Sequence, residues 1–201
     1  MDDVSNLREE GKFKESIKLA QVFISDLYGS LSLAYRRLHN LEEAKKAAEE
    51  SVKIAKENNL KGDLARPLFN LAKVQEELGE ISKAVVTYKE SIGIFQQDNP
   101  KLHNRSGVLA DMKIHLAVCE YKNGDRTALD RILQAINELD NSDEKTVSKY
   151  NFDVWMSGAY MNLAEILKDK KYLMKAKEII DANPELKIRK EQWEKLNQNF
   201  L

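Results

Sequence analysis

Histidine, cysteine and closely spaced carboxylates are the residues most able to carry chemistry, and in this sequence they are scattered. The three histidines, His39, His103 and His115, have no partner at the spacing that metal ligands require. The single cysteine, Cys119, follows Val118 in an apolar stretch, which is typical of a small core residue. No glycine-rich phosphate loop accompanies them. The sequence therefore predicts no metal site, no cofactor and no catalytic centre.

Composition narrows the class of partner. The 201 residues include 32 basic and 33 acidic side chains, and the formal net charge is −1. A nucleic-acid-binding protein usually has a strong basic excess, so nucleic acid is not the expected partner. No apolar run approaches the roughly 18 residues of a membrane span, and the polar, acidic N-terminus is not a secretory signal. With one cysteine and no internal disulfide, we expect a soluble cytoplasmic protein.

One predicted helical hairpin, from Leu64 to Gln97, shows the residue pattern of the helices that would hold polar side chains in place. Large and small residues follow one another along its two helices in a fixed order: Leu68, Leu71, Ala72 and Gln75, then Ile81, Ala84, Tyr88 and Ser91. The small residues Ala72 and Ala84 allow the helices to approach closely. Gly79 lies between them and can adopt the left-handed backbone that ends a helix.

The same order recurs along the chain, so the sequence predicts an array of repeats. Upstream, the turn falls at His39-Asn40, where Asn40 is expected to replace glycine; downstream it falls at Gly124. Residues 14–25 are amphipathic, and Asp26 is expected to cap a separate helix after them. The predicted hairpins cover residues 1–25, 26–59, 63–98, 104–139 and 152–183, followed by a capping helix at 185–199. We expect a single domain of residues 1–201.

These repeated positions resemble the tetratricopeptide repeat family, over about Leu7 to Asn183. The spacing exceeds the family's usual period of about 34 residues: Asn40 and Gly79 are 39 residues apart, and Gly79 and Gly124 are 45 apart. The resemblance is therefore to members with repeats of about 40 residues. It implies an all-α fold, a right-handed α-α superhelix of four to five helical hairpins closed by the C-terminal capping helix.

The resemblance also implies a binding groove, because in this family the first helix of each hairpin lines the concave surface. Carried over by register, the groove residues on the second and third hairpins are Arg36, Arg37, Arg66, Phe69, Asn70 and Lys73. On the later hairpins the register gives Ile114, His115, Val118, Tyr121, Asn162 and Glu165. Asn70 and Asn162 both precede a Leu-Ala pair, where an Asn in related peptide binders bonds to the peptide backbone. The arginines and Lys73 favour an acidic segment.

The expected function is that of a non-catalytic scaffold that binds a protein or peptide segment in this groove. The family's clamp for chaperone C-termini is not expected, since Ser30, Leu33, Asp111 and His115 do not supply its residues. A peptide-sensing domain of a larger signalling or transcription regulator is an alternative. Another is a self-assembling structural module, in which the N-terminal hairpin pairs in a homodimer. An enzyme built on a helical-repeat frame has no catalytic constellation to support it.

Overall fold

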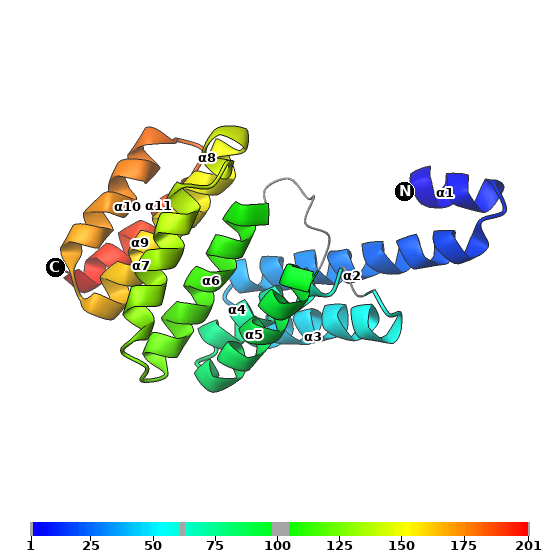
Figure 1. Ribbon diagram of the computed structural model, residues 1–201, viewed down its shortest axis with the longest axis horizontal. Coiled ribbons are helices and arrows are strands. Elements are labelled where there is room, and N and C mark those ends of the chain that lie inside the picture. The colour runs from blue at the N-terminus through cyan, green and yellow to red at the C-terminus, as the bar shows by residue number, and fades with distance from the viewer. Residues whose placement is uncertain (1, 61–62, 98–104, 201) are drawn as a thin grey trace. The chain divides into compact units, whose positions relative to one another are not determined.

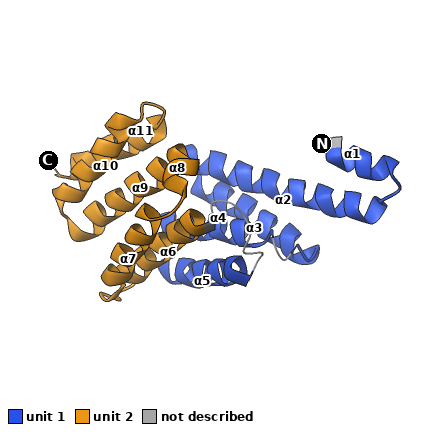
Figure 2. Ribbon diagram, turned by 45° about the horizontal axis from the view of Figure 1, so that its top comes forward, with its two compact units in different colours: residues 1–98 blue, residues 99–201 orange. Residues whose placement is uncertain are grey.

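The computed structural model describes residues 2–60, 63–97 and 105–200, and every regular element within these ranges is helical. The chain divides into two compact units, residues 1–98 and 99–201, coloured separately in Figure 2. His103 and the hairpin boundary expected between residues 98 and 104 lie outside the described residues.

The described residues of the first unit form five helices, which are labelled in Figure 1. They are α1 (Asp2–Glu9), α2 (Phe13–Arg37), α3 (Leu41–Glu57), α4 (Ala65–Glu77) and α5 (Ile81–Gln97). Helices α2 and α3 pack as one antiparallel pair and α4 and α5 as the next, with α4 also in contact with α3 and α2. The core between them includes Ala44, Ala48, Leu68 and Val74. The predicted all-α arrangement of sequential helical hairpins is confirmed for these helices.

A repeat of 40 residues is visible in the hydrogen bonds of the first unit. The hydroxyl of Ser51 donates to the carbonyl of Ser25 at 2.7 Å, across the α2/α3 pair. Forty residues further on, the hydroxyl of Ser91 donates to the carbonyl of Ala65 at 2.6 Å, across the α4/α5 pair. Small residues therefore occur at matching positions where the two helices of each pair come together. The prediction that Ala72 and Ala84 form such a close approach agrees with their complete burial.

The turns within the pairs show which residues end the first helices. Gly79 has φ +76°, as expected, and the amides of Gly79 and Glu80 bond to the carbonyls of Glu76 and Gln75. In the preceding pair the left-handed residue is His39, with φ +56°. The expectation that Asn40 takes this role is wrong: Asn40 is the N-cap of α3, and its side chain accepts from the Glu43 amide. His39 and Gly79 are 40 residues apart, which matches the serine repeat.

Helix α2 corrects the predicted boundary between the first two hairpins. It runs without interruption through Ser25 and Asp26, so residues 13–25 and 26–37 form one helix of 25 residues. No proline lies in this stretch, and the Asp26 carboxylate pairs with Arg66 instead of capping a helix. Figure 1 shows the N-terminal half of α2 extending past α3, with α1 beside it. The Ser16 hydroxyl fastens α1 by donating to the Val4 carbonyl at 2.9 Å.

The second unit contains α6 (Arg105–Lys122), α7 (Ala128–Asp140), α8 (Glu144–Val147), α9 (Lys149–Leu167), α10 (Lys170–Ala182) and α11 (Lys187–Asn197), followed by the short 3₁₀ helix η1 (Gln198–Phe200). Helices α6 and α7 form one pair, and α9 and α10 form another. Their shared core includes Ile114, Ile132, Leu139 and Leu163. The hairpins predicted at 104–139 and 152–183 compare with the helix pairs at 105–140 and 149–182.

The predicted capping helix corresponds to α11. Its Trp193 and Leu196, with Phe200 of η1, pack against buried residues of α9 and α10. The Trp193 indole also donates to the Leu173 carbonyl at 2.8 Å. This contact half-buries Trp193 and Leu196, whereas Ile188 of the same helix remains 46% exposed. The handedness of a superhelix and the single-domain organisation depend on the whole array and remain predictions.

Candidate binding surface

The predicted groove residues of the first unit lie on neighbouring helices. Arg36 and Arg37 are at the C-terminal end of α2, and Arg66, Phe69, Asn70 and Lys73 follow one another along α4. The two helices approach closely at Gly29 of α2, where a β-carbon would lie 3.3 Å from Nδ2 of Asn70. We call this face of Arg36, Arg37, Arg66, Phe69, Asn70 and Lys73 the α2/α4 surface.

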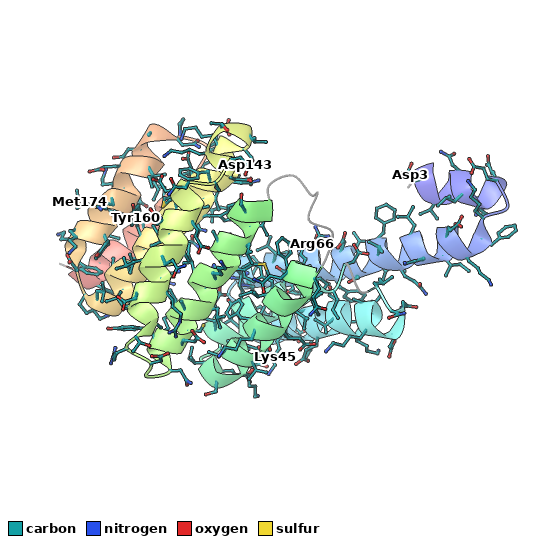
Figure 3. All side chains as sticks on the ribbon, in the orientation of Figure 1. Asp3, Lys45, Arg66, Asp143, Tyr160 and Met174 are labelled. Carbon is teal, nitrogen blue, oxygen red and sulfur yellow. The ribbon has the colours of Figure 1, made fainter. Side chains whose placement is uncertain are left out.

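Two of the predicted cations on the α2/α4 surface already have acidic partners. Arg66 pairs with Asp26 of α2, and Arg36 pairs with Glu77 of α4 (Arg66 is labelled in Figure 3). Both ion pairs cross between the two helices. Arg36 is largely covered and its Nε atom has no hydrogen-bond partner, whereas Arg66 is 67% exposed. The surface is therefore less basic than the arginines alone predict.

Phe69 and Lys73 form the middle of the surface. The Phe69 ring is half-buried and packs on Tyr88 of α5, with ring centroids 5.5 Å apart. The Lys73 ammonium lies 4.2 Å from the Phe69 centroid, in the geometry of a cation–π contact. Tyr88 is fully buried and its hydroxyl donates to Glu76 at 3.0 Å, which holds the Tyr88 ring in place against Phe69. The aromatic ring is thus held from beneath and covered by a positive charge.

Asn70 is the polar group of the α2/α4 surface that remains available. It is half-buried, and its neighbours Leu71 and Ala72 point into the core, which fixes the direction of the amide. Within residues 2–60, 63–97 and 105–200, no side-chain hydrogen bond or ion pair involves Asn70. An amide in this position can both donate and accept a hydrogen bond. Asn70 therefore has the chemistry to bond to an extended backbone laid over α4.

The predicted groove positions on α6 are only partly on the surface. Ile114 and Val118 are buried in the core of the second unit, so their assignment to a groove is wrong. Both side chains are apolar and pack inside the second unit. Their positions in the repeat do not by themselves show whether a side chain is buried. His115 is half-buried and its Nε2 lies 3.9 Å from Asp111 Oδ1. Tyr121 packs at the edge of the same core, with the Arg126 guanidinium 4.5 Å from its ring centroid.

The predicted positions on α9 show a shift of register. In the first unit Gly79 follows Ala72 by seven residues, but the left-handed Lys168 follows Ala164 by only four. Asn162 therefore does not occupy the structural position of Asn70, although both precede a Leu-Ala pair. Glu165 is exposed, and its carboxylate lies 3.5 Å from the Lys122 ammonium of α6. The shift concerns α9 alone, because on α6 the left-handed Gly124 follows Ala117 by seven residues, as Gly79 follows Ala72.

Sequence reasoning missed the two acidic residues that neutralise the arginines, although a signal for one of them exists. Asp26 and Arg66 are 40 residues apart, so they occupy the same position in consecutive repeats. Equivalent positions on adjacent first helices lie side by side, and opposite charges at such positions can pair. Applying the 40-residue period to charged residues would have predicted the contact.

Within the described ranges, two further kinds of site are not found. No group of three or more histidine, cysteine or acidic residues is placed to hold a metal ion. No described helix is long and apolar enough to span a membrane. Cys119 is buried, as its surroundings in the sequence predict.

Comparison with known proteins identifies the repeat. Residues 23–97 match the family model described as "Tetratricopeptide repeat". A solved structure, the crystal structure of BtubC (BKLC) from P. vanneervenii, resembles the chain with a TM-score of 0.56 and 22% sequence identity, over 89% of this chain and 77% of that chain. No curated protein matches the sequence. The α2/α4 surface lies inside the matched segment, and residues 23–97 are a tetratricopeptide repeat domain with the fold of a helical-repeat protein.

Proposed function

We propose that the chain is a non-catalytic binding module and that the α2/α4 surface holds an extended segment of a partner protein. Tetratricopeptide repeats are generally protein-interaction modules, which supports this class of function. The observation that carries the proposal is the Asn70 amide, which lies half-buried on α4 without a side-chain partner in the described part of the chain. Its donor and acceptor match the N–H and C=O of a peptide backbone.

The rest of the α2/α4 surface is suited to an extended ligand. Phe69 packs on Tyr88 and holds the Lys73 ammonium above its ring, so this part of the surface presents a positioned positive charge. Two packed helices position these groups before binding. A preorganised surface lowers the entropy that must be lost when a flexible segment becomes ordered.

An acidic segment is the favoured ligand. Arg66 is exposed and its partner Asp26 is also partly exposed, with side-chain values of 67% and 36%. Exposed ion pairs contribute only about 0–1 kcal/mol, so a carboxylate of the ligand can replace Asp26 at small cost. Lys73 and Arg37 add positive charge nearby. The ligand side chains and Asp26 therefore compete for the same cation.

A peptide-display experiment tests the proposal. Random 12-residue phage-displayed peptides are selected on the full chain, and the best peptide is synthesised with a fluorophore for anisotropy measurements. Replacement Asn70→Ala is expected to weaken binding about 5–10-fold, as loss of about one hydrogen bond predicts. Asn137→Ala, at an exposed position of α7, is the matched control and should leave affinity unchanged. Equal loss in both variants, or none in Asn70→Ala, rejects the assignment.

The charge preference has its own pair of variants. Asp26→Asn removes the internal competitor for Arg66 and should tighten the binding of an acidic peptide. Arg66→Glu should weaken it. If both variants bind as the wild type does, Arg66 does not contact the ligand and only the Asn70 contact remains supported.

A further inference from the structure

Helix α2 carries an apolar ridge that its own unit does not cover. The ridge residues are Phe13, Ile17, Ala20, Ile24, Leu27, Leu31, Ala34 and Leu38. The six large members are between 42% and 76% exposed, with Leu27 at 67% and Leu38 at 76%. The buried residues of α2, by contrast, are Ser16, Ser25, Gly29 and Ser32. The helix thus packs inward through small residues and presents its large apolar residues to solvent.

In the next repeat, the same face of the first helix is covered by a neighbouring helix. Ile24, Leu27 and Leu31 are equivalent, 40 residues on, to Leu64, Pro67 and Leu71. Pro67 and Leu71 are buried and Leu64 packs against the core, where α3 and α4 are in contact. On α2 the neighbour is α1, eight residues long, which leaves Phe13 and Ile17 about 60% exposed. The ridge therefore lacks the helix that covers its counterpart on α4.

The spacing of the ridge is that of a coiled coil. Its residues are separated by 4, 3, 4, 3, 4, 3 and 4 positions from Phe13 to Leu38, an unbroken alternation. Such a pattern over at least three heptads is the signature of a helix that pairs with another helix along its length. No charged residue interrupts the ridge.

The ridge is also complementary to itself when reversed. Pairing residues whose numbers sum to 51 places Phe13 opposite Leu38 and Ile24 opposite Leu27. It also places the small residues opposite large ones, Ala34 opposite Ile17 and Ala20 opposite Leu31. In a parallel pair each alanine would face its own copy and leave a gap. Alternating large and small residues fill the interface evenly only in the antiparallel pair.

We propose that two copies of this chain associate through the α2 ridge, antiparallel, about a twofold axis between Ile24 and Leu27. The contact is isologous, since each ridge position meets its complement on the other copy. With six large side chains 42–76% exposed, the ridge offers on the order of several hundred Å² of apolar surface per copy, comparable with the ~800 Å² that each partner buries in a standard interface. This interface goes beyond the proposed peptide-binding function and gives the alternative of a homodimer through the N-terminal hairpin a defined helix, register and orientation.

Sedimentation velocity on the full chain tests the association. The wild type should show a concentration-dependent dimer, and Ile24→Lys or Leu27→Lys should raise its dissociation constant at least about 100-fold by placing a charge in the apolar contact. Val86→Lys is the matched control, because Val86 is 66% exposed on α5 and outside the ridge. Circular dichroism confirms that each variant remains folded. A wild-type monomer at about 0.5 mM, or a dimer unaffected by both ridge variants, overturns the proposal and leaves the ridge to a different protein.

Cysteine cross-linking tests the orientation. Phe13→Cys and Leu38→Cys chains are mixed and oxidised; the buried Cys119 of the unmodified chain should give no cross-link. The antiparallel pair predicts a disulfide between the two different variants and none between two Phe13→Cys chains. Cross-linking of Phe13→Cys to itself, without the mixed product, contradicts the antiparallel arrangement.

Discussion

The hydroxyl of Ser91 on α5 donates a 2.6 Å hydrogen bond to the carbonyl of Ala65 on α4, 26 residues earlier. The carbonyl belongs to the first residue of α4 and the serine is fully buried. The bond joins the open end of one helical pair, far from its turn at Gly79. Because Ser51 and Ser25 form the same contact one repeat earlier, the relationship is a property of the repeat.

Replacing Ser91 with alanine should therefore destabilise the first unit. Loss of a buried hydrogen bond costs about 1 kcal/mol, and the melting temperature is expected to fall by about 2–5 °C. The exposed Ser30 on α2, whose hydroxyl bonds only within its own helix to the Asp26 carbonyl, provides the comparison, since Ser30→Ala has the same change in helix propensity. Thermal unfolding by circular dichroism should separate the two variants. A decrease no larger for Ser91→Ala than for Ser30→Ala would show that the bond between helices contributes nothing.

Substitutions at the two turn residues with positive φ, His39 and Gly79, are predicted to have opposite effects on stability. His39→Gly removes the side-chain penalty of a positive φ and should stabilise the chain by about 0.5–1 kcal/mol. Gly79→Ala introduces that penalty and should destabilise it by about 1 kcal/mol. A β-carbon at Gly79 meets no atom within 4 Å, so the cost comes from the backbone conformation and not from a clash. Urea unfolding of both variants measures the difference, and a loss of stability in His39→Gly would contradict the account.

Glu144 predicts a pH dependence. Its side chain on α8 is fully buried; Asn151 donates to Oε1 at 3.5 Å, and Oε2 has no partner. Burial raises the pKa of this carboxyl, and the neighbouring charge of Asp143 adds to the increase. Because the pKa is raised in the folded state, the stability that Glu144 contributes is full below the ordinary carboxylate pKa of about 4.3 and is lost as the pH rises through the folded value.

Glu144→Gln keeps the shape and removes the ionisation. The variant should unfold several degrees higher than the wild type at pH 8, and the difference should shrink toward pH 4. Glu138→Gln on α7, where the carboxylate is partly exposed and pairs with Lys113 at 2.7 Å, is the comparison and should show no such gain at pH 8. A difference between Glu144→Gln and wild type that stays constant with pH would exclude the titration of Glu144 as the cause.

Much of the fold could be predicted because it depends on local pattern. The order of large and small residues placed Ala72 and Ala84 in the contact between α4 and α5, and glycine placed the turn at Gly79. The predictions were wrong at positions where two local conformations have similar energies. Asp26 is a good helix cap, but nothing before it stops a helix, so α2 continues. Either residue of His39-Asn40 can adopt a left-handed conformation; His39 adopts it and Asn40 caps α3.

The candidate site was less predictable, since it depends on contacts between repeats. Register placed Arg36 and Arg66 on one surface but did not show that Glu77 and Asp26 neutralise them. On α6 the same register assigned Val118 to the surface, whereas an apolar side chain is buried wherever packing allows it. Asn70 was identified by register alone, and only the structure adds that its amide has no side-chain partner in the described residues.

The most direct test of the binding surface is an NMR titration of the ¹⁵N-labelled full chain with the selected acidic peptide. The side-chain amide signals of Asn70, assigned by their absence in Asn70→Ala, should be among those that shift most, together with backbone amides of α4 around Phe69 and Lys73. Saturation of the peptide with the Asn70 signals unmoved, and with the shifts confined to other helices, would contradict the assignment of the α2/α4 surface.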